Sequence, residues 1–132
     1  MSQQDLTADM LTRIRNSVRN RAPVVDCLNN KLNRGVAHVL VEEGYVTKFD
    51  VIDDGRQGVL RVTLKYGPRG EQILHQIDRV SKVGCRVYQR VAELPRPMQG
   101  MGVVIVSTSR GVMSDRRCRE ENVGGELVAI VS

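Results

Sequence analysis

Aromatic residues are scarce in this sequence. One phenylalanine and three tyrosines are the only aromatic side chains among its 132 residues, and tryptophan is absent. Proteins that hold single-stranded nucleic acid by stacking its bases present several exposed rings. If a nucleic acid is the partner, the sequence therefore favours recognition through phosphates, hydroxyl groups and shape over recognition through rows of stacked bases.

Signals for a membrane or a secretory pathway are also missing. No apolar run approaches the roughly 18 residues that a membrane span requires, and the first ten residues lack a charged segment followed by an apolar one. The three cysteines, Cys27, Cys85 and Cys118, lie far apart and form no Cys-x-x-Cys pair. Reduced thiols in a cytosol fit this pattern. We therefore expect a cytoplasmic protein without a membrane partner.

Motifs for catalysis and for cofactor binding are absent as well. Ser109 does not lie in a Gly-x-Ser-x-Gly elbow, because Ser107 occupies the first glycine position. The histidines and cysteines have no zinc-ligand spacing, and the loop of residues 67–70 lacks the Lys-Ser/Thr of a phosphate-binding loop. We expect no enzyme activity, cofactor, metal ion or small-molecule substrate. The alternative from the enzyme class is a small hydrolase that uses Ser109 or Cys118, which requires a general base beside the nucleophile.

The chain does have an excess of basic residues. Lysine and arginine total 20 against 15 acidic residues, which gives a net charge of +5 and a pI near 9.5. This balance favours polyanionic partners such as nucleic acid, and arginine, which forks to phosphate oxygens, outnumbers lysine. A solvated face explains any one of these residues equally well, and a basic protein that binds any duplex is a further alternative. The recurring basic positions are Arg13, Arg15, Arg19, Arg21, Lys31, Arg34, Arg86, Arg90, Arg110, Arg116, Arg117 and Arg119.

The first half of the chain has the pattern of an α-β-α-β-β unit. Residues 7–20 carry an apolar helical stripe, for which Thr7 is the expected N-cap. Strands are expected over 24–28, 45–52 and 59–66. A second helix is expected over 31–43, with Asn29 or Asn30 as its N-cap and Gly44 after its end. The expected buried side chains of the two helices are Met10, Leu11, Ile14 and Val18, and Leu32, Val36, Val39 and Leu40.

The second half is expected to be mainly β. The turn of residues 67–70 is the predicted boundary between domain 1–66 and domain 67–132. Residues 73–80 fit either a strand or a helix. Strands are expected over 85–90, 103–107 and 126–131, with a short helix from Ser114 to about residue 122. The predicted fold class is thus α+β: two small lobes, the second mainly β with short helices.

A triplet of hydroxyl residues ends the apolar run 103–107. Alternation along a strand would place Ser107 and Ser109 on one face and Thr108 on the other, unless the chain bends before Gly111. A hydroxyl donates and accepts, which complements the ribose 2′-hydroxyls that A-form RNA displays across its minor groove. Serine and threonine at a strand end also bond to local backbone. Taken by themselves, the residues leave both explanations open.

Several segments in order resemble one family. The segment STSRGVMSDRR, preceded by LPRPMQGMGVVIV and followed by GGE, resembles the C-terminal signature of bacterial small-subunit ribosomal protein eight. The segments DMLTRIRN, LVEEGYV and RVSKVGCRVY are also similar to that family. The resemblance implies a non-enzymatic structural protein that binds the central domain of small-subunit rRNA and helps the platform assemble. It also implies proteins five and twelve of the subunit as neighbours.

The resemblance further implies two RNA-binding regions. The main one lies in the second lobe, where Glu126 would accept a hydrogen bond from RNA or orient an arginine. Family members usually have serines where this chain has Asn29 and Asn30, and many have proline at the position of Val83. The implied RNA-binding residues are Ser107, Thr108, Ser109, Arg110, Gly124, Gly125, Glu126, Arg86 and Tyr88 in the main region, and Arg13, Arg15, Asn16, Asn30 and Lys31 in the second.

Overall fold

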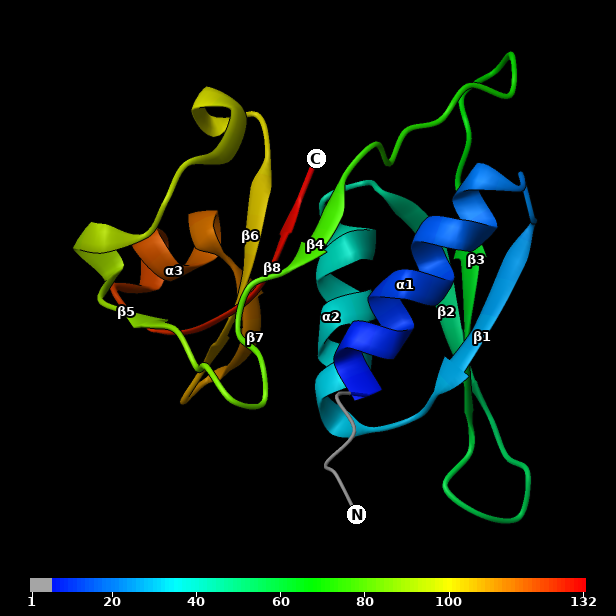
Figure 1. Ribbon diagram of the computed structural model, residues 1–132, viewed down its shortest axis with the longest axis horizontal. Coiled ribbons are helices and arrows are strands. Elements are labelled where there is room, and N and C mark those ends of the chain that lie inside the picture. Colours follow the sequence, from blue (N-terminus) through cyan, green and yellow to red (C-terminus); the bar gives the residue numbers. More distant parts are fainter. Residues whose placement is uncertain (1–5) are drawn as a thin grey trace. The chain divides into compact units, whose positions relative to one another are not determined.

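The computed structural model describes residues 6–132, which form three α-helices and two antiparallel sheets (Figure 1). The expected α+β class is confirmed. Contacts divide this part of the chain into an N-terminal unit, Leu6–His75, and a C-terminal unit, Gln76–Ser132. The division lies a few residues after the turn of residues 67–70, and the domains 1–66 and 67–132 stay a prediction. No helix in residues 6–132 is long and apolar enough to cross a membrane.

The N-terminal unit has the expected α-β-α-β-β order. Strand β3 lies in the middle of its sheet and pairs antiparallel with β1 and β2. Asn30 is the N-cap of the second helix, and Gly44 follows its end with φ +83°, as expected. The elements are α1 (Leu6–Arg19), β1 (Val24–Leu28), α2 (Lys31–Glu42), β2 (Val46–Ile52) and β3 (Val59–Leu64).

Both helices bury the apolar stripes that their spacing predicts, with one change. The four residues expected for α1 are all buried. In α2 the stripe shifts, because Leu32 is only partly buried while Asn33 and Ala37 are fully buried. Burying the amide of Asn33 requires hydrogen-bond partners for it, since an unpaired buried polar group is costly.

A buried polar contact ties α1 to α2 and β1. The Thr7 hydroxyl donates to Asn33 Oδ1 at 3.0 Å, and Asn33 Nδ2 donates to the carbonyl oxygen of Leu28 at 2.9 Å. Thr7 is 2% exposed and lies within α1. The prediction of Thr7 as the helix N-cap is therefore wrong, because its hydroxyl serves a tertiary contact that local spacing does not reveal.

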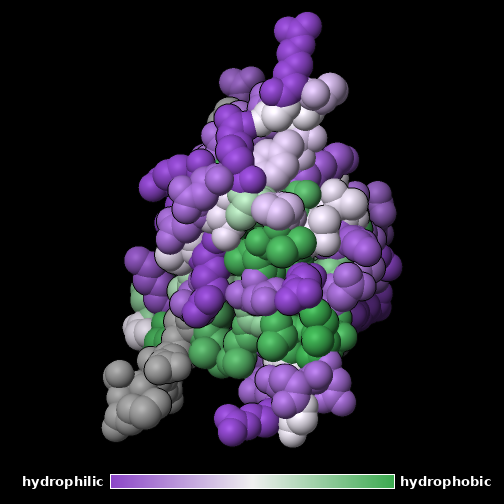
Figure 2. Space-filling view, turned by 90° about the vertical axis from the view of Figure 1, so that its right-hand side faces the viewer, coloured by the Kyte–Doolittle hydropathy of each residue, from purple (hydrophilic) through white to green (hydrophobic). Residues whose placement is uncertain are grey.

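The face of the N-terminal sheet that is turned away from α1 and α2 is open to solvent (Figure 2). Figure 2 shows an apolar band on this face below a polar one. Leu28 and Ile52 both pair with Val59 and therefore lie in one row on one face of this sheet, where they are 37% and 36% exposed. In the neighbouring row, Arg61 Nε donates to Asp26 Oδ1 at 2.8 Å, and this hydrogen bond lowers the pKa of the Asp26 carboxyl.

The C-terminal unit is mainly β with short helices, as expected. Its sheet has the order β4-β8-β6-β7, and β5 pairs with the start of β8. Ser114 caps the helix α3, also as expected. The elements are β4 (Ile77–Arg79), β5 (Tyr88–Gln89), the 3-10 turns Val91–Glu93 and Pro97–Gly100, β6 (Val103–Thr108), β7 (Gly111–Ser114), α3 (Asp115–Glu121) and β8 (Gly125–Val131).

Several strands within residues 6–132 differ from the expectation. The expected strand 85–90 is reduced to β5, Tyr88–Gln89. The ambiguous segment 73–80 contributes the strand β4. The segment 111–114 is a strand that the sequence did not predict, because it is short and follows directly after a turn. The expected strand 59–66 ends at Leu64, and the hydroxyl of Tyr66 beyond it donates to the carbonyl oxygen of Ala22 at 2.6 Å.

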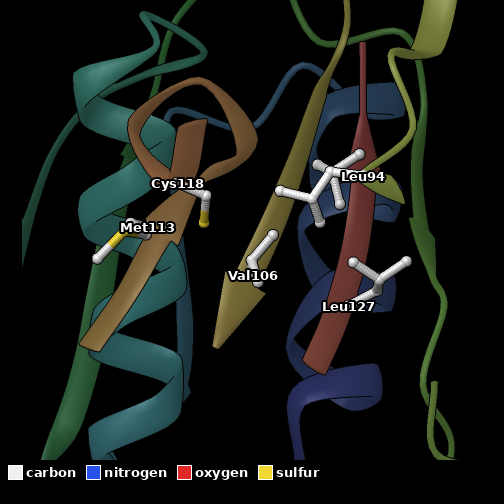
Figure 3. Close-up of a cluster of buried hydrophobic side chains, with 6 residues drawn as sticks. Leu94, Val106, Met113, Cys118 and Leu127 are labelled. Carbon is white, nitrogen blue, oxygen red and sulfur yellow. The ribbon is translucent and has the colours of Figure 1, made fainter. Parts of the chain in front are cut away.

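The core of the C-terminal unit lies between its sheet and α3. Figure 3 shows this cluster of buried hydrophobic side chains, which come from β6, β7, β8, α3 and the segment at Leu94. Cys118 is fully buried there, and burial raises the pKa of its thiol to about 11. The cluster consists of Leu94, Val104, Val106, Met113, Cys118 and Leu127. It lies beside the ends of β6 and β8 that carry the candidate site, because Val106 precedes Ser107 and Leu127 follows Glu126.

Replacing Thr7 tests the buried contact between the helices. Thr7→Ala removes the donor to Asn33 and leaves a buried amide oxygen unpaired, so the free energy of unfolding should fall by about 1–2 kcal/mol. The control is Thr12→Ala in the same helix, whose side chain is exposed. Urea unfolding of both variants measures the difference. Equal stabilities would show that the contact contributes nothing.

Candidate nucleic-acid interface

The hydroxyl triplet lies where β6 turns into β7. The strand β6 ends at Thr108, and β7 begins at Gly111, whose φ is +113°. The Thr108 hydroxyl donates to the carbonyl oxygen of Gly111 at 2.7 Å and accepts from the amide of Arg110 at 3.0 Å. Thr108 thus holds the turn together. Ser109, which is exposed and lies in the turn, is no longer bound by strand alternation.

Residues far apart in the sequence form one row across the sheet beside this turn. Ser107 of β6 pairs with Glu126 of β8, and Glu126 also pairs with Tyr88 of β5. Directly paired residues of neighbouring strands project from the same face. Ser107, Glu126 and Tyr88 therefore share a face, and Tyr88 is 69% exposed. We call these three residues the cross-strand row.

Two glycines make this row possible. A Cβ on Gly125 would collide with the carbonyl oxygen of Ser107 and would lie 3.2 Å from Thr108 Cα. A Cβ on Gly124 would collide with the carbonyl oxygen of Gln89 and would lie 2.9 Å from Arg90 Cα. The Gly-Gly pair is therefore required for close packing of β8 against its neighbours, which is a structural reason for these two predicted site residues.

Arg86 is oriented by an acid. Its Nη1 lies 3.1 Å from Glu126 Oε2, so Glu126 orients this arginine, and a contact of Glu126 with RNA stays a prediction. The loop that carries Arg86 is closed by reciprocal backbone bonds between Lys82 and Cys85, both 3.0 Å long. The Ser81 hydroxyl also accepts from the amide of Val87 at 2.8 Å. These bonds define the turn that contains Val83.

Arg110 is oriented in a similar way by the helix α3. Its Nη1 lies 3.5 Å from Glu121 Oε1, while Arg117 Nε lies 2.8 Å from Glu121 Oε2. The hydrogen bond from Arg117 lowers the pKa of the Glu121 carboxyl, and Arg110 adds to the shift. The carboxylate is thus ionised at neutral pH and holds both guanidinium groups at the end of the hairpin.

Arg119 has a structural role. Its Nη1 donates to Asp115 Oδ2 at 2.7 Å, and its Nη2 donates to the carbonyl oxygens of Leu94 and Pro95. Asp115 is 2% exposed and also accepts from the amide of Val104 at 3.0 Å. The sequence did not distinguish Arg119 from a surface arginine, since only the tertiary fold brings its partners together.

A hollow of about 350 Å³ beside the cross-strand row was not predicted from the sequence. The turn after β5 forms one wall, where the amide of Glu93 donates to the carbonyl oxygen of Arg90 at 2.9 Å. No sequence motif marks this place, because its walls come from two separate segments. The lining residues are Tyr88, Gln89, Arg90, Glu93 and Gly125.

The second predicted region lies in the N-terminal unit. Arg13 Nε donates to Asp9 Oδ2 at 2.8 Å on α1, which partly neutralises its charge. Asn30 Oδ1 accepts from the amide of Asn33 at 2.7 Å as the cap of α2, and Lys31 beside it is exposed. Asn29 is buried: its amide nitrogen donates to the carbonyl oxygen of Gln57 at 2.8 Å. Arg15 and Asn16 lie in α1, where Arg15 is half-buried and Asn16 is exposed.

The structure does not favour the hydrolase alternative, because neither proposed nucleophile has a histidine of its own unit as a base. Cys118 lies in the core, and its raised pKa keeps the thiol protonated near neutral pH. Ser109 is exposed, but both histidines of the chain, His38 and His75, belong to the N-terminal unit. Among residues 6–132, no group of three His, Cys, Asp or Glu side chains is placed to hold a metal ion.

The chain matches one family along nearly all of its length. A family model described as Ribosomal protein S8 matches residues 5–132. The small ribosomal subunit protein uS8 of Caldicellulosiruptor bescii is 46% identical over 127 residues, which cover 96% of each chain. Proteins of the same name from Alkaliphilus oremlandii and Streptococcus pneumoniae are each 44% identical over 131 residues, covering 99% of each chain.

The three cysteines should differ in reactivity. Cys85 is exposed, whereas burial raises the pKa of Cys27 and of Cys118 to about 11. A thiol reagent such as Ellman's reagent at mildly alkaline pH should therefore modify one thiol per native chain and all three after unfolding. Cys85→Ala should abolish the fast reaction. A native chain with two reactive thiols would contradict the burial of Cys27 or of Cys118.

Replacing Gly125 tests the close approach of β8 to β6. Gly125→Ala places a methyl group against the backbone of Ser107, so the free energy of unfolding should fall by about 1–3 kcal/mol. The matched control is Gly84→Ala, because a Cβ at Gly84 would meet nothing within 4 Å. Chemical denaturation compares the two. If both variants are as stable as the parent, the strands do not approach as closely as described.

Proposed function

We propose the function of this chain from one premise: it belongs to the ribosomal protein S8 family. As a member, it is a structural constituent of the small ribosomal subunit and binds rRNA. Proteins of this family are structural rather than enzymatic. The location of the protein in the cell is accordingly the small subunit of the ribosome.

The finer proposal concerns the RNA and the surface that binds it. We propose that the protein is a primary binder of the central domain of small-subunit rRNA and that it helps the platform assemble. The C-terminal unit carries the main surface in this proposal. The observation that supports it most is the cross-strand row of Ser107, Glu126 and Tyr88, which lies beside the turn with Ser109 and Arg110.

Each group in this surface suits a different part of an RNA helix. Ser107 and Ser109 present small hydroxyls that can donate to and accept from ribose and base edges. Arg86 and Arg110 are held in place by Glu126 and Glu121, so less side-chain freedom is lost when they meet phosphates, although each carboxylate offsets part of the positive charge, as Asp9 does at Arg13. Charge neutralisation would supply affinity, and the hydroxyl contacts would supply fit.

The second region would add contacts from the N-terminal unit. Lys31 and Arg15 are proposed to meet phosphates, with Arg13 contributing less because Asp9 offsets its charge. Asn16 and the Asn30 amide nitrogen would donate to RNA, since the Asn30 oxygen already caps α2. By the same family resemblance, we propose proteins five and twelve of the small subunit as protein neighbours.

A comparison of two RNAs across a salt series tests the proposal. The protein should bind a fragment of the central rRNA domain more tightly than an unrelated RNA helix at every salt concentration. A binder that reads charge alone would have equal affinity for both and a steep salt dependence as its only signature. Equal affinities would overturn the proposal.

Ser109→Ala should weaken binding to the central-domain fragment by about 1–2 kcal/mol, because one interfacial hydrogen bond is lost. Its effect on the unrelated helix should be smaller, and the salt slope should not change, since the substitution removes no charge. The matched control is Thr47→Ala, an exposed hydroxyl of β2 outside both proposed regions. Equilibrium binding measures all of these affinities. Affinity of the parent chain in Ser109→Ala would remove this serine from the site.

A further inference from the structure

Glu121 bridges an arginine of the β6–β7 turn and an arginine of its own helix. Its Oε1 lies 3.5 Å from Arg110 Nη1, and its Oε2 lies 2.8 Å from Arg117 Nε. The side chains of Arg110 and Arg117 are 61% and 52% exposed, whereas that of Glu121 is 30% exposed. One carboxylate is therefore shared by two cations that both remain open to a partner in solution.

The shared carboxylate reduces the charge that this end of the hairpin presents. The three side chains together carry a net charge of +1, where the two arginines without Glu121 would carry +2. Attraction between arginine and phosphate is the same for every nucleic acid, so it adds affinity without selecting a sequence or a shape. A phosphate that approaches from the side of Glu121 also meets a like charge, which suppresses contacts in the wrong geometry.

The same ion pair sets the direction of the Arg110 side chain. The pair engages Nη1, and a guanidinium has further N–H groups with which it can donate to a phosphate. The turn itself is fixed, because the amide of Arg110 donates to the Thr108 hydroxyl at 3.0 Å. An RNA positioned by contacts with Ser109 thus meets a guanidinium that is already oriented, and it loses less freedom on binding. An RNA docked in another way gains only from the reduced charge.

We propose that Glu121 is a specificity-determining residue: it weakens the attraction of Arg110 and Arg117 for any RNA more than it weakens binding of an RNA that fits the hydroxyl triplet. The inference rests on the proposed function, because it assumes that Arg110 meets RNA. Glu121 acts through the two arginines and is therefore a positioning residue. Selectivity at this surface then arises partly from a penalty against wrong partners, in addition to contacts with the right one.

Glu121→Gln tests this role, because it removes the charge and keeps the size of the side chain. The full chain is titrated at low ionic strength with the central-domain rRNA fragment and with an unrelated RNA helix. Binding to the unrelated helix should tighten about two- to fivefold, the range expected for the release of an exposed ion pair. Binding to the fragment should stay within about 1.5-fold of the parent chain. Equal tightening for both RNAs would leave the selectivity unchanged and overturn the proposal.

The neighbouring acid supplies a matched control. Glu120 is exposed and lies in the same helix, so Glu120→Gln raises the net charge by the same one unit. It should change the affinity for the two RNAs by one common, smaller factor. The salt slope for the unrelated helix should steepen by about one unit with Glu121→Gln, a change that lower stability alone does not produce. If the two variants have the same effects on affinity and slope, general charge explains them and the proposal fails.

A variant without the two arginines shows whether Glu121 acts through them. In a chain with Arg110→Gln and Arg117→Gln, the further change Glu121→Gln should affect both RNAs no more than Glu120→Gln does. A full effect in this background would overturn the assigned route. If the parent chain does not select the fragment over the unrelated helix, the proposed function itself fails. If the parent chain selects the fragment and Glu121→Gln keeps the full selectivity, only the inference about Glu121 fails.

Discussion

The C-terminal unit depends on the close approach of β8 to the strands on both of its sides. Gly125 lies against the backbone of Ser107, and Gly124 lies against the backbone at Gln89 and Arg90. Any side chain at these two positions would push the strands apart and break the pairing that continues into the unit. The cross-strand row, the orientation of Arg86 by Glu126 and the hollow at Tyr88 all follow from this one steric constraint.

The position of each carboxylate determines whether its arginine partner has a structural role or stays at the surface, where it can contact RNA. Asp115 is buried and holds Arg119 against two backbone carbonyls, so this pair braces the segment at Leu94. Glu121 and Glu126 hold Arg110 and Arg86 at the surface, where exposed ion pairs contribute little to stability but limit side-chain motion. A net charge of +5 is thus spread unevenly over sites with different roles.

Local signals in the sequence predicted much of the fold. The apolar stripe of α1, the cap at Asn30, the glycine after α2 and the cap at Ser114 each depend on residues within one or two turns of helix. Predictions were wrong or incomplete where a distant partner decides the outcome. Thr7 bonds to Asn33 instead of capping its helix, and β7 exists because β6 lies beside it.

For the site, too, some features could be predicted from the sequence and others depend on the tertiary structure. The sequence by itself determined the family, the order of the elements and the residue types that suit RNA, because these are written in consecutive motifs. Only the tertiary structure decided that Ser107, Glu126 and Tyr88 form one row, and that the Thr108 hydroxyl donates to the carbonyl oxygen of Gly111 in the turn. The physical reason is that strand pairing joins segments that are far apart in the chain. The hollow at Tyr88 is also a tertiary feature in one respect, because Gly125 of β8 closes it beside the segment of residues 88–93.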